Sequence, residues 1–223
     1  MTSHHLATRR AGPPPTGRRE RRRAEMRERL FRAALELFAE RGFLETTVED
    51  ITEAADVGKG TFFNYFPTKE HVLATLGAER LAVIERAYDR AQTGPVLPAL
   101  KEMAIELVGH YSENAALLRA IYAAHASCEP VRRELLKRLH TGRRLLTEIY
   151  ALAQERGEIP GDRSPEELAR LTQIVFLGVI LAWALNPDLP LSKTAEPVWE
   201  LFSAEFRAKR KRISTGTSRR ARP

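Results

Sequence analysis

The segment TVEDITEAADVGKGTFFNYFPTKE, residues 47–70, constrains the fold more than any other part of the chain. Thr47 and Asp50 match a capping box, in which the threonine hydroxyl accepts a hydrogen bond from the third backbone N–H of a new helix. The apolar residues that follow recur at the spacing of one helical face. After a turn at 56–57, a second short helix would end before Pro67, because proline cannot continue it. The segment therefore predicts two short helices joined by a tight turn.

A longer helix is predicted in front of this pair. Its apolar residues recur at three- and four-residue spacing from Met26 to Phe38, and Gly42 is a typical helix stop. One long helix followed by two short ones describes a helix-turn-helix, in which the second short helix lies in the major groove of DNA. We therefore expect this part of the chain to form a three-helix DNA-binding domain.

The second short helix carries side chains suited both to a core and to a nucleic acid. Phe62 and Phe66 are four residues apart and share one helical face, which we expect to turn toward the core. The residues left for the other side are Thr61, Phe63, Asn64 and Tyr65. The flanking residues are Gly58, Lys59, Gly60 and Lys69. The glycines would let the backbone approach a sugar-phosphate chain, and the lysines would supply positive charge for phosphates.

With these residues in view, the segment from Met26 to Leu76 resembles the DNA-binding domain of the TetR family of bacterial transcription regulators. The likeness lies in TTVEDITEAADVGKGTFFNYFPTKEHVL, where a threonine opens the second helix and Gly-Thr is followed by aromatic residues and a lysine. The resemblance implies DNA contacts from Thr47, Lys59, Gly60, Thr61, Phe63, Asn64, Tyr65 and Lys69.

Three positions depart from the family pattern. Gly58 replaces the commoner serine cap and caps less well. Asp56 stands where the turn usually has glycine, and aspartate is among the few residues that tolerate a left-handed backbone. Phe63 replaces a frequent tyrosine, so a hydroxyl-to-phosphate bond is lost and only apolar contact with sugar or a thymine methyl group is left. The last departure puts one of the family's contacts in doubt.

The rest of the chain also predicts helices, and no segment alternates with period two, so the chain is all-α. Ser164 followed by Pro-Glu-Glu is a strong helix start. That helix carries the apolar run IVFLGVILAWAL, residues 174–185. The run is shorter than the roughly 20 residues that a bilayer span needs, so we expect a buried helix and no membrane span.

The resemblance further implies a C-terminal helical bundle that binds an effector and forms a homodimer. The dimer would use the last two long helices, here 165–185 and 197–209. The run 174–185 in the first of these is apolar around almost its whole circumference, which is more than one-sided packing needs. Gly178 and Ala182, four residues apart, would allow close helix approach. Burial of this helix inside one monomer is the alternative.

The effector pocket would lie among the middle helices. Candidate lining residues are the less usual types found there: Met103, His110, Tyr111, Tyr122, His125, Cys128 and Trp183. Each is also an ordinary core or surface residue type. Because few are charged, we expect an apolar or aromatic small molecule. The spacing of the two histidines and the cysteine is not that of a compact metal-ligand set, so neither a metal site nor a cofactor is predicted.

The net charge of +7 is unevenly distributed, because both ends are basic and the middle is acidic. Residues 1–23 and 210–223 are expected to be disordered basic tails, which either contact DNA or are only solvated. The expected domains are 24–70 for DNA binding and 71–209 for effector binding and dimerisation. A single cysteine precludes an intramolecular disulfide, and the N-terminus lacks the apolar core of a signal peptide. These features favour a cytoplasmic protein.

The sequence therefore predicts a regulator of transcription that binds double-stranded DNA. By the resemblance, it would be a repressor that binds a palindromic operator as a dimer and is released by a small molecule. An activator, or an architectural protein of the same fold that binds DNA nonspecifically, stays open as an alternative. No nucleophile elbow, phosphate loop or metal-ligand motif supports an enzyme.

Overall fold

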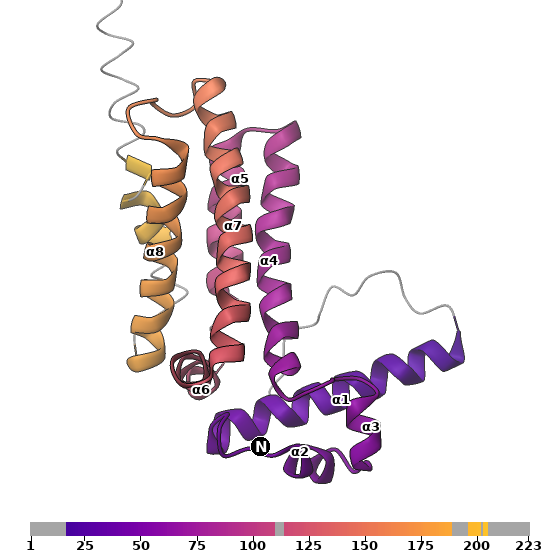
Figure 1. The fold of residues 1–223 in the computed structure, drawn as a ribbon. Coiled ribbons are helices and arrows are strands. Elements are labelled where there is room, and N and C mark those ends of the chain that lie inside the picture. The colour runs from indigo at the N-terminus through magenta and orange to yellow at the C-terminus, as the bar shows by residue number, and fades with distance from the viewer. Residues whose placement is uncertain (1–16, 110–113, 189–195, 202, 205–223) are drawn as a thin grey trace, which may run out of the picture. The chain divides into compact units, whose positions relative to one another are not determined.

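The computed structural model describes residues 17–109, 114–188, 196–201 and 203–204 (Figure 1). All regular structure within these residues is helical and none is strand, which confirms the all-α prediction. The helices are α1 Arg18–Arg41, α2 Val48–Ala54, α3 Lys59–Phe63, α4 Glu70–Thr93, α5 Val96–Gly109, α6 Ala115–Ser127, α7 Glu129–Glu155 and α8 Pro165–Leu185. A further helical segment covers 196–201, so the rest of the helix expected at 197–209 lies mostly outside the described residues.

Contacts divide the chain into two compact units. The first unit combines the chain up to Thr75 with Ala116–Arg132, and the second combines Leu76–Ala115 with the chain from Arg133 onward. This grouping differs from the expected division at residue 70, because α6 groups with the N-terminal helices and not with the rest of 71–209.

Helix α1 begins at Arg18, earlier than the expected domain start at residue 24. Residues 18–25 are all exposed, so no apolar period marks this part of the helix. Arginine, alanine and glutamate are strong helix formers, which explains why the helix extends beyond the region that packs. The arm expected to be disordered is therefore helical from residue 18, while the rest of it and the tail at 210–223 lie outside the described residues.

The connection from α1 to α2 forms as the sequence predicts. Gly42 ends α1 with a φ of 90°, and its N–H donates to the carbonyl of Phe38 at 3.0 Å. At the start of α2, the N–H of Asp50 donates to the Thr47 hydroxyl at 3.1 Å, and the N–H of Thr47 donates to the Asp50 carboxylate at 2.7 Å. This is the predicted capping box. Helix α2 packs against both α1 and α3 (Figure 1).

The second unit is a helical bundle in which α5 and α8 pack together (Figure 1). Helix α8 has the predicted cap, because the N–H of Glu167 donates to the Ser164 hydroxyl at 3.1 Å. Deep in the core, the hydroxyls of Tyr150 and Thr172 lie 2.7 Å apart and share a hydrogen bond. Burial raises the pKa of the Tyr150 phenol far above its ordinary value, so this group stays neutral.

Helix α8 is not the fully buried helix that we expected. Only 33% of its most apolar window is buried, and it is long and apolar enough, by length and composition alone, to cross a membrane. It is the one such helix in the part of the chain that the structure describes, and core helices also meet these criteria. Its exposed apolar side chains, Ile174, Leu181 and Leu185, follow one another at helical spacing. They form one side of the helix that no described part of the chain covers.

Candidate nucleic-acid interface

Two phenylalanines hold the short helix α3 in the first unit. Phe62 and Phe66 are 0% and 1% exposed, and their ring centroids lie 5.7 Å apart. This confirms that their shared face turns toward the core. The helix ends at Phe63, earlier than expected, and a turn continues to Phe66, whose N–H donates to the Phe62 carbonyl at 2.9 Å.

The opposite side of this segment is accessible. Phe63 is 47% exposed, and its ring meets the Phe62 ring edge to face at 5.5 Å. Asn64 is exposed, while Thr61 and Tyr65 are partly exposed. No side-chain hydrogen bond engages these three polar residues within the described part of the chain. Their polar groups are therefore available to an external partner.

The backbone before α3 is equally open. A side chain at Gly58 or Gly60 would meet no atom within 4 Å, so no part of the described chain covers these positions. The turn that leads to them has Asp56 at a φ of 49°. This confirms that aspartate adopts the left-handed backbone at a position where glycine is common. Arg29 from α1 donates to the Asp56 carbonyl at 3.4 Å and ties the turn to the first helix.

Lys59, at the start of α3, already has an acidic partner. Its ammonium forms a hydrogen-bonded ion pair with the carboxylate of Glu49 on α2. This bond lowers the pKa of Glu49 below its ordinary value. Both side chains are more than half exposed, so the ion pair is open to solvent and Lys59 can readily change partner.

Thr47 is exposed at the N-terminus of α2, yet its hydroxyl is engaged. The hydroxyl donates to the Asp50 carboxylate at 2.6 Å and accepts from the Asp50 N–H at 3.1 Å. Hydrogen bonds from Thr47 lower the pKa of Asp50, and Arg41 at 3.6 Å adds a smaller contribution. The hydroxyl proton of Thr47 would have to leave Asp50 before it could bond to a phosphate.

Lys69 lies just before α4 and points toward the loop between α1 and α2. Its ammonium donates to the carbonyls of Phe43 at 2.8 Å, Leu44 at 3.2 Å and Thr46 at 2.8 Å. The same nitrogen lies 4.6 Å from the centroid of the Phe43 ring. Of the residues that the sequence assigns to DNA contact, Lys69 is therefore the one whose charged group is fully engaged by the protein's own backbone.

The candidate effector residues do not gather in one place. Met103 and Trp183 are buried in the second unit, whereas Tyr122, His125 and Cys128 are partly exposed in the first. His110 and Tyr111 lie outside the described residues. No group of three or more histidine, cysteine or acidic residues that could hold a metal ion occurs within the described ranges.

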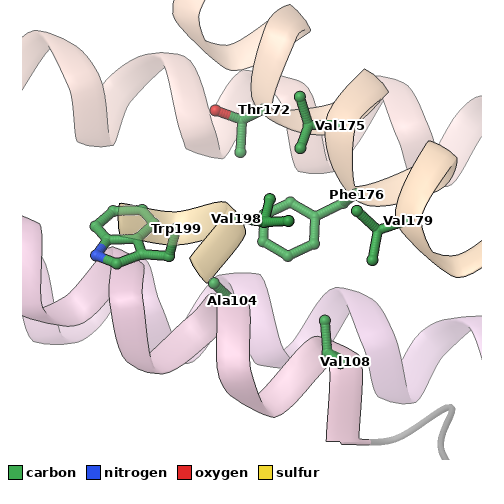
Figure 2. A pocket seen from close by; sticks show the side chains of 8 residues that line it. All are labelled: Ala104, Val108, Thr172, Val175, Phe176, Val179, Val198 and Trp199. Carbon is green, nitrogen blue, oxygen red and sulfur yellow. The ribbon is translucent and has the colours of Figure 1, made fainter. Parts of the chain in front are cut away.

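A small apolar pocket lies in the second unit between α5, α8 and the segment 196–201 (Figure 2). Its lining residues are Ala104, Val108, Thr172, Val175, Phe176, Val179, Val198 and Trp199. Its cavity volume is about 20 Å³, which holds about one water molecule. None of the five candidate residues that the structure describes lines it, and the residues that do are of types found in any core.

Known proteins share both the sequence and the fold. Residues 30–76 match the family described as bacterial regulatory proteins, tetR family. The chain is 27% identical over 199 residues to the HTH-type transcriptional repressor DhaR of Mycobacterium sp. (strain GP1), and the match covers 83% of this chain and 93% of DhaR.

Solved structures extend the likeness. FadR of Thermus thermophilus, a TetR family transcriptional repressor solved in complex with lauroyl-CoA, is 34% identical, with a TM-score of 0.57, and the match covers 80% of this chain and 94% of FadR. SmeT of Stenotrophomonas maltophilia, solved with triclosan, shares the fold, with a TM-score of 0.71 at 20% identity, over 81% of this chain and 90% of SmeT. Because the identity to FadR extends over nearly the whole of that protein, the chain belongs to the TetR family and is a DNA-binding regulator of transcription, not an enzyme.

Proposed function

We propose that the protein is a cytoplasmic repressor that binds a palindromic operator as a homodimer and is released by an apolar small molecule. The observation that carries this proposal is the two-sided segment from Gly58 to Phe66. Its buried phenylalanines fix it to the first unit, and its other side presents accessible polar groups beside an open backbone. This is the arrangement that a recognition helix needs in order to enter a major groove.

The exposed residues divide by the chemistry of their side chains. Asn64 carries an amide, which can bond in a bidentate manner to the edge of adenine, so we assign it to base reading. Thr61 and Tyr65 carry hydroxyls suited to phosphate oxygens, and Gly60 lets the backbone come close to them. Phe63 contributes apolar contact with sugar or a thymine methyl group. The residues proposed to meet DNA are Thr47, Lys59, Gly60, Thr61, Phe63, Asn64 and Tyr65.

The proposed homodimer rests on the uncovered side of α8. Ile174, Leu181 and Leu185 are 58%, 39% and 69% exposed, which is unusual for three large apolar residues on one side of a helix. Gly178 and Ala182 lie on the same side and are exposed too. A side chain at Gly178 would meet no atom within 4 Å, so a second helix has room to approach closely there. A second copy of α8 would cover this surface, and the two-fold axis of the dimer would relate the two recognition helices.

The proposed effector site is the pocket between α5 and α8. Phe176 of α8 and Val198 of the C-terminal segment both point into it (Figure 2). Its polar side-chain groups are the indole N–H of Trp199 and the hydroxyl of Thr172, and that hydroxyl already donates to the Leu168 carbonyl at 2.8 Å. An apolar ligand therefore fits the lining. Because the cavity is small, such a ligand has to move the segment 196–201 away from α8 in order to enter.

Two proteins that share this fold were solved with ligands that contain an apolar part, FadR with lauroyl-CoA and SmeT with triclosan. In this protein, a ligand that binds better to the opened pocket would favour a state with lower affinity for the operator, which is a shift between two populations. We propose repression, and not activation, because relatives such as DhaR are repressors.

The test begins with purified protein and a random pool of duplex DNA at low salt. The bound fraction is sequenced, and the proposal predicts enrichment of one inverted repeat. The complex of the protein with the enriched duplex is then titrated with lauroyl-CoA, whose acyl chain is the apolar probe, and with free coenzyme A as the control that lacks this chain. Release by lauroyl-CoA alone supports the effector site. Enrichment of no sequence contradicts the proposal and favours nonspecific binding, and stronger binding with the probe contradicts release.

A further inference from the structure

The ammonium of Lys69 is held by the backbone of its own protein. A lysine ammonium has three N–H donors, and in this structure three carbonyl oxygens accept from it. The ring of Phe43 closes another side at 4.6 Å, which adds a cation–π interaction. The ring is itself held, since Phe43 is 3% exposed and meets Phe38 edge to face at 5.1 Å. No donor of the ammonium is left for a phosphate.

The three carbonyls belong to the loop 42–46, which connects α1 to Thr47, the N-cap of α2. The loop begins at Gly42, and Thr46 is fully buried, with its hydroxyl donating to the Gly42 carbonyl at 2.7 Å. Thr47 follows directly and is the N-cap of α2. The Lys69 ammonium therefore fixes the loop at the point where the chain turns into the capping box. A displaced loop would displace Thr47 and the start of α2 with it.

We propose that Lys69 is a positioning residue that holds the loop 42–46 and so places the N-terminus of α2 for DNA, and that its charge makes no phosphate contact. This inference rests on the proposed function and replaces the role that the sequence assigns to Lys69. A lysine can support DNA affinity in two ways, by contacting a phosphate or by anchoring a loop, and a salt titration distinguishes them. Loss of a phosphate contact lowers the salt dependence of binding, whereas loss of a loop anchor weakens binding through the geometry of another residue.

The first experiment measures operator affinity of the wild type and the variants Lys69→Met and Lys69→Arg between about 50 and 200 mM salt. Lys137→Met, on an exposed side chain of α7, is the control for the lost net charge. Positioning predicts that Lys69→Met weakens binding by roughly tenfold while the slope of log affinity against log salt matches that of the control. A phosphate contact instead predicts a slope shallower by about one.

The variant Lys69→Arg also distinguishes positioning from a phosphate contact, and it keeps the positive charge. A planar guanidinium binds phosphate at least as well as an ammonium. It is larger than an ammonium, however, and its N–H groups are spread over a plane, so it does not reproduce the single nitrogen that lies 2.8 to 3.2 Å from all three carbonyls. Positioning therefore predicts that Lys69→Arg also binds the operator more weakly than the wild type. Affinity equal to or above that of the wild type overturns the proposal, and so does the shallower slope.

A double-mutant cycle then asks whether Lys69 acts through Thr47. If the two residues contact DNA independently, the losses of Lys69→Met and Thr47→Ala multiply. If Lys69 positions Thr47, the combined loss falls short of the product by a factor of about two or more. A combined loss equal to the product overturns the proposal.

The last readout needs no DNA. The N–H groups of Asp50 and Ile51 bond to Thr47, at 3.1 and 3.3 Å, and their hydrogen exchange reports how firmly α2 begins. Lys69→Met should accelerate this exchange relative to Lys137→Met, and unchanged exchange contradicts positioning. Failure of the wild type to select any sequence would contradict the proposed function, whereas these amide results would still decide the role of Lys69 in the loop.

Discussion

The Lys59 ammonium and the Glu49 carboxylate form an ion pair between the first residue of α3 and the first turn of α2. Glu49 therefore competes with a phosphate for the Lys59 ammonium, although the ion pair engages only one of its three N–H donors. The pair places a negative charge beside the proposed DNA surface and reduces the net charge that this surface presents.

Glu49→Gln should therefore strengthen DNA binding. The variant removes the repulsion between carboxylate and phosphate and frees Lys59, so we expect affinity for any duplex to rise a few-fold, with a salt slope steeper by up to about one. The matched control is Glu155→Gln, which removes an exposed carboxylate at the end of α7. Equal effects of the two variants would show that only the net charge matters, and weaker binding by Glu49→Gln would contradict a phosphate role for Lys59.

The capping box of α2 should make stability depend on pH in acid. The folded-state pKa of Asp50 lies below its ordinary value of 3.8, chiefly because of hydrogen bonds from Thr47. A depressed pKa means that the stabilisation is present above the unfolded-state pKa and is lost as the pH falls through the folded-state pKa. Asp50→Asn keeps the shape but not the charge, so the difference in free energy of unfolding between wild type and variant should shrink below pH 3.8. A difference that stays constant from pH 7 to acid, measured by urea unfolding, would argue against this role.

The turn before α3 should prefer glycine to alanine. Asp56 has a φ of 49°, a conformation that costs a residue with a Cβ about 1 kcal/mol or more relative to glycine. We expect Asp56→Gly to be more stable than Asp56→Ala by about 1 kcal/mol in urea unfolding. At Glu53, inside α2, the order should reverse, because alanine favours a helix over glycine by about 1 kcal/mol. If the glycine variant were the more stable at both Asp56 and Glu53, or the alanine variant at both, the left-handed turn would be contradicted.

The uncovered side of α8 predicts how a larger side chain at Gly178 acts. Because no described part of one copy lies within 4 Å of a side chain at this position, Gly178→Leu should fold and gain helix propensity. If a second α8 packs closely there, the added side chain should weaken the homodimer by roughly tenfold or more, and Gly178→Ala should weaken it less. Sedimentation equilibrium over a range of concentrations measures both. An unchanged dimer would place the interface elsewhere.

Local patterns were enough to predict much of the first unit. The spacing of Phe62 and Phe66 predicts which side of α3 is buried, and the Thr47–Asp50 pair predicts the start of α2, because both depend on neighbours within one turn of a helix. The helical start of α1 at Arg18 was missed, since exposed residues carry no apolar period there.

Contacts between distant residues could not be predicted in this way. The three carbonyls around Lys69 come from residues 43–46, and only the folded path of the loop brings them together. The Glu49–Lys59 pair depends on the turn between α2 and α3 in the same way. In the second unit, the pocket is lined by valines, alanine, aromatic residues and one threonine. Residues of these types occur in any core, so no sequence pattern distinguishes them.

The most direct test of the central claim compares the sequences that wild type and Asn64→Ala select from the same random duplex pool. If α3 reads DNA in a symmetric homodimer, the wild type enriches an inverted repeat, and the variant loses its base preference at one position in each half-site while the rest of the repeat is kept. Tyr65→Phe is the matched control, because a lost phosphate bond should weaken binding to all sequences without changing the preferred bases. An unchanged preference in Asn64→Ala, or a wild type that enriches no sequence, would contradict the account.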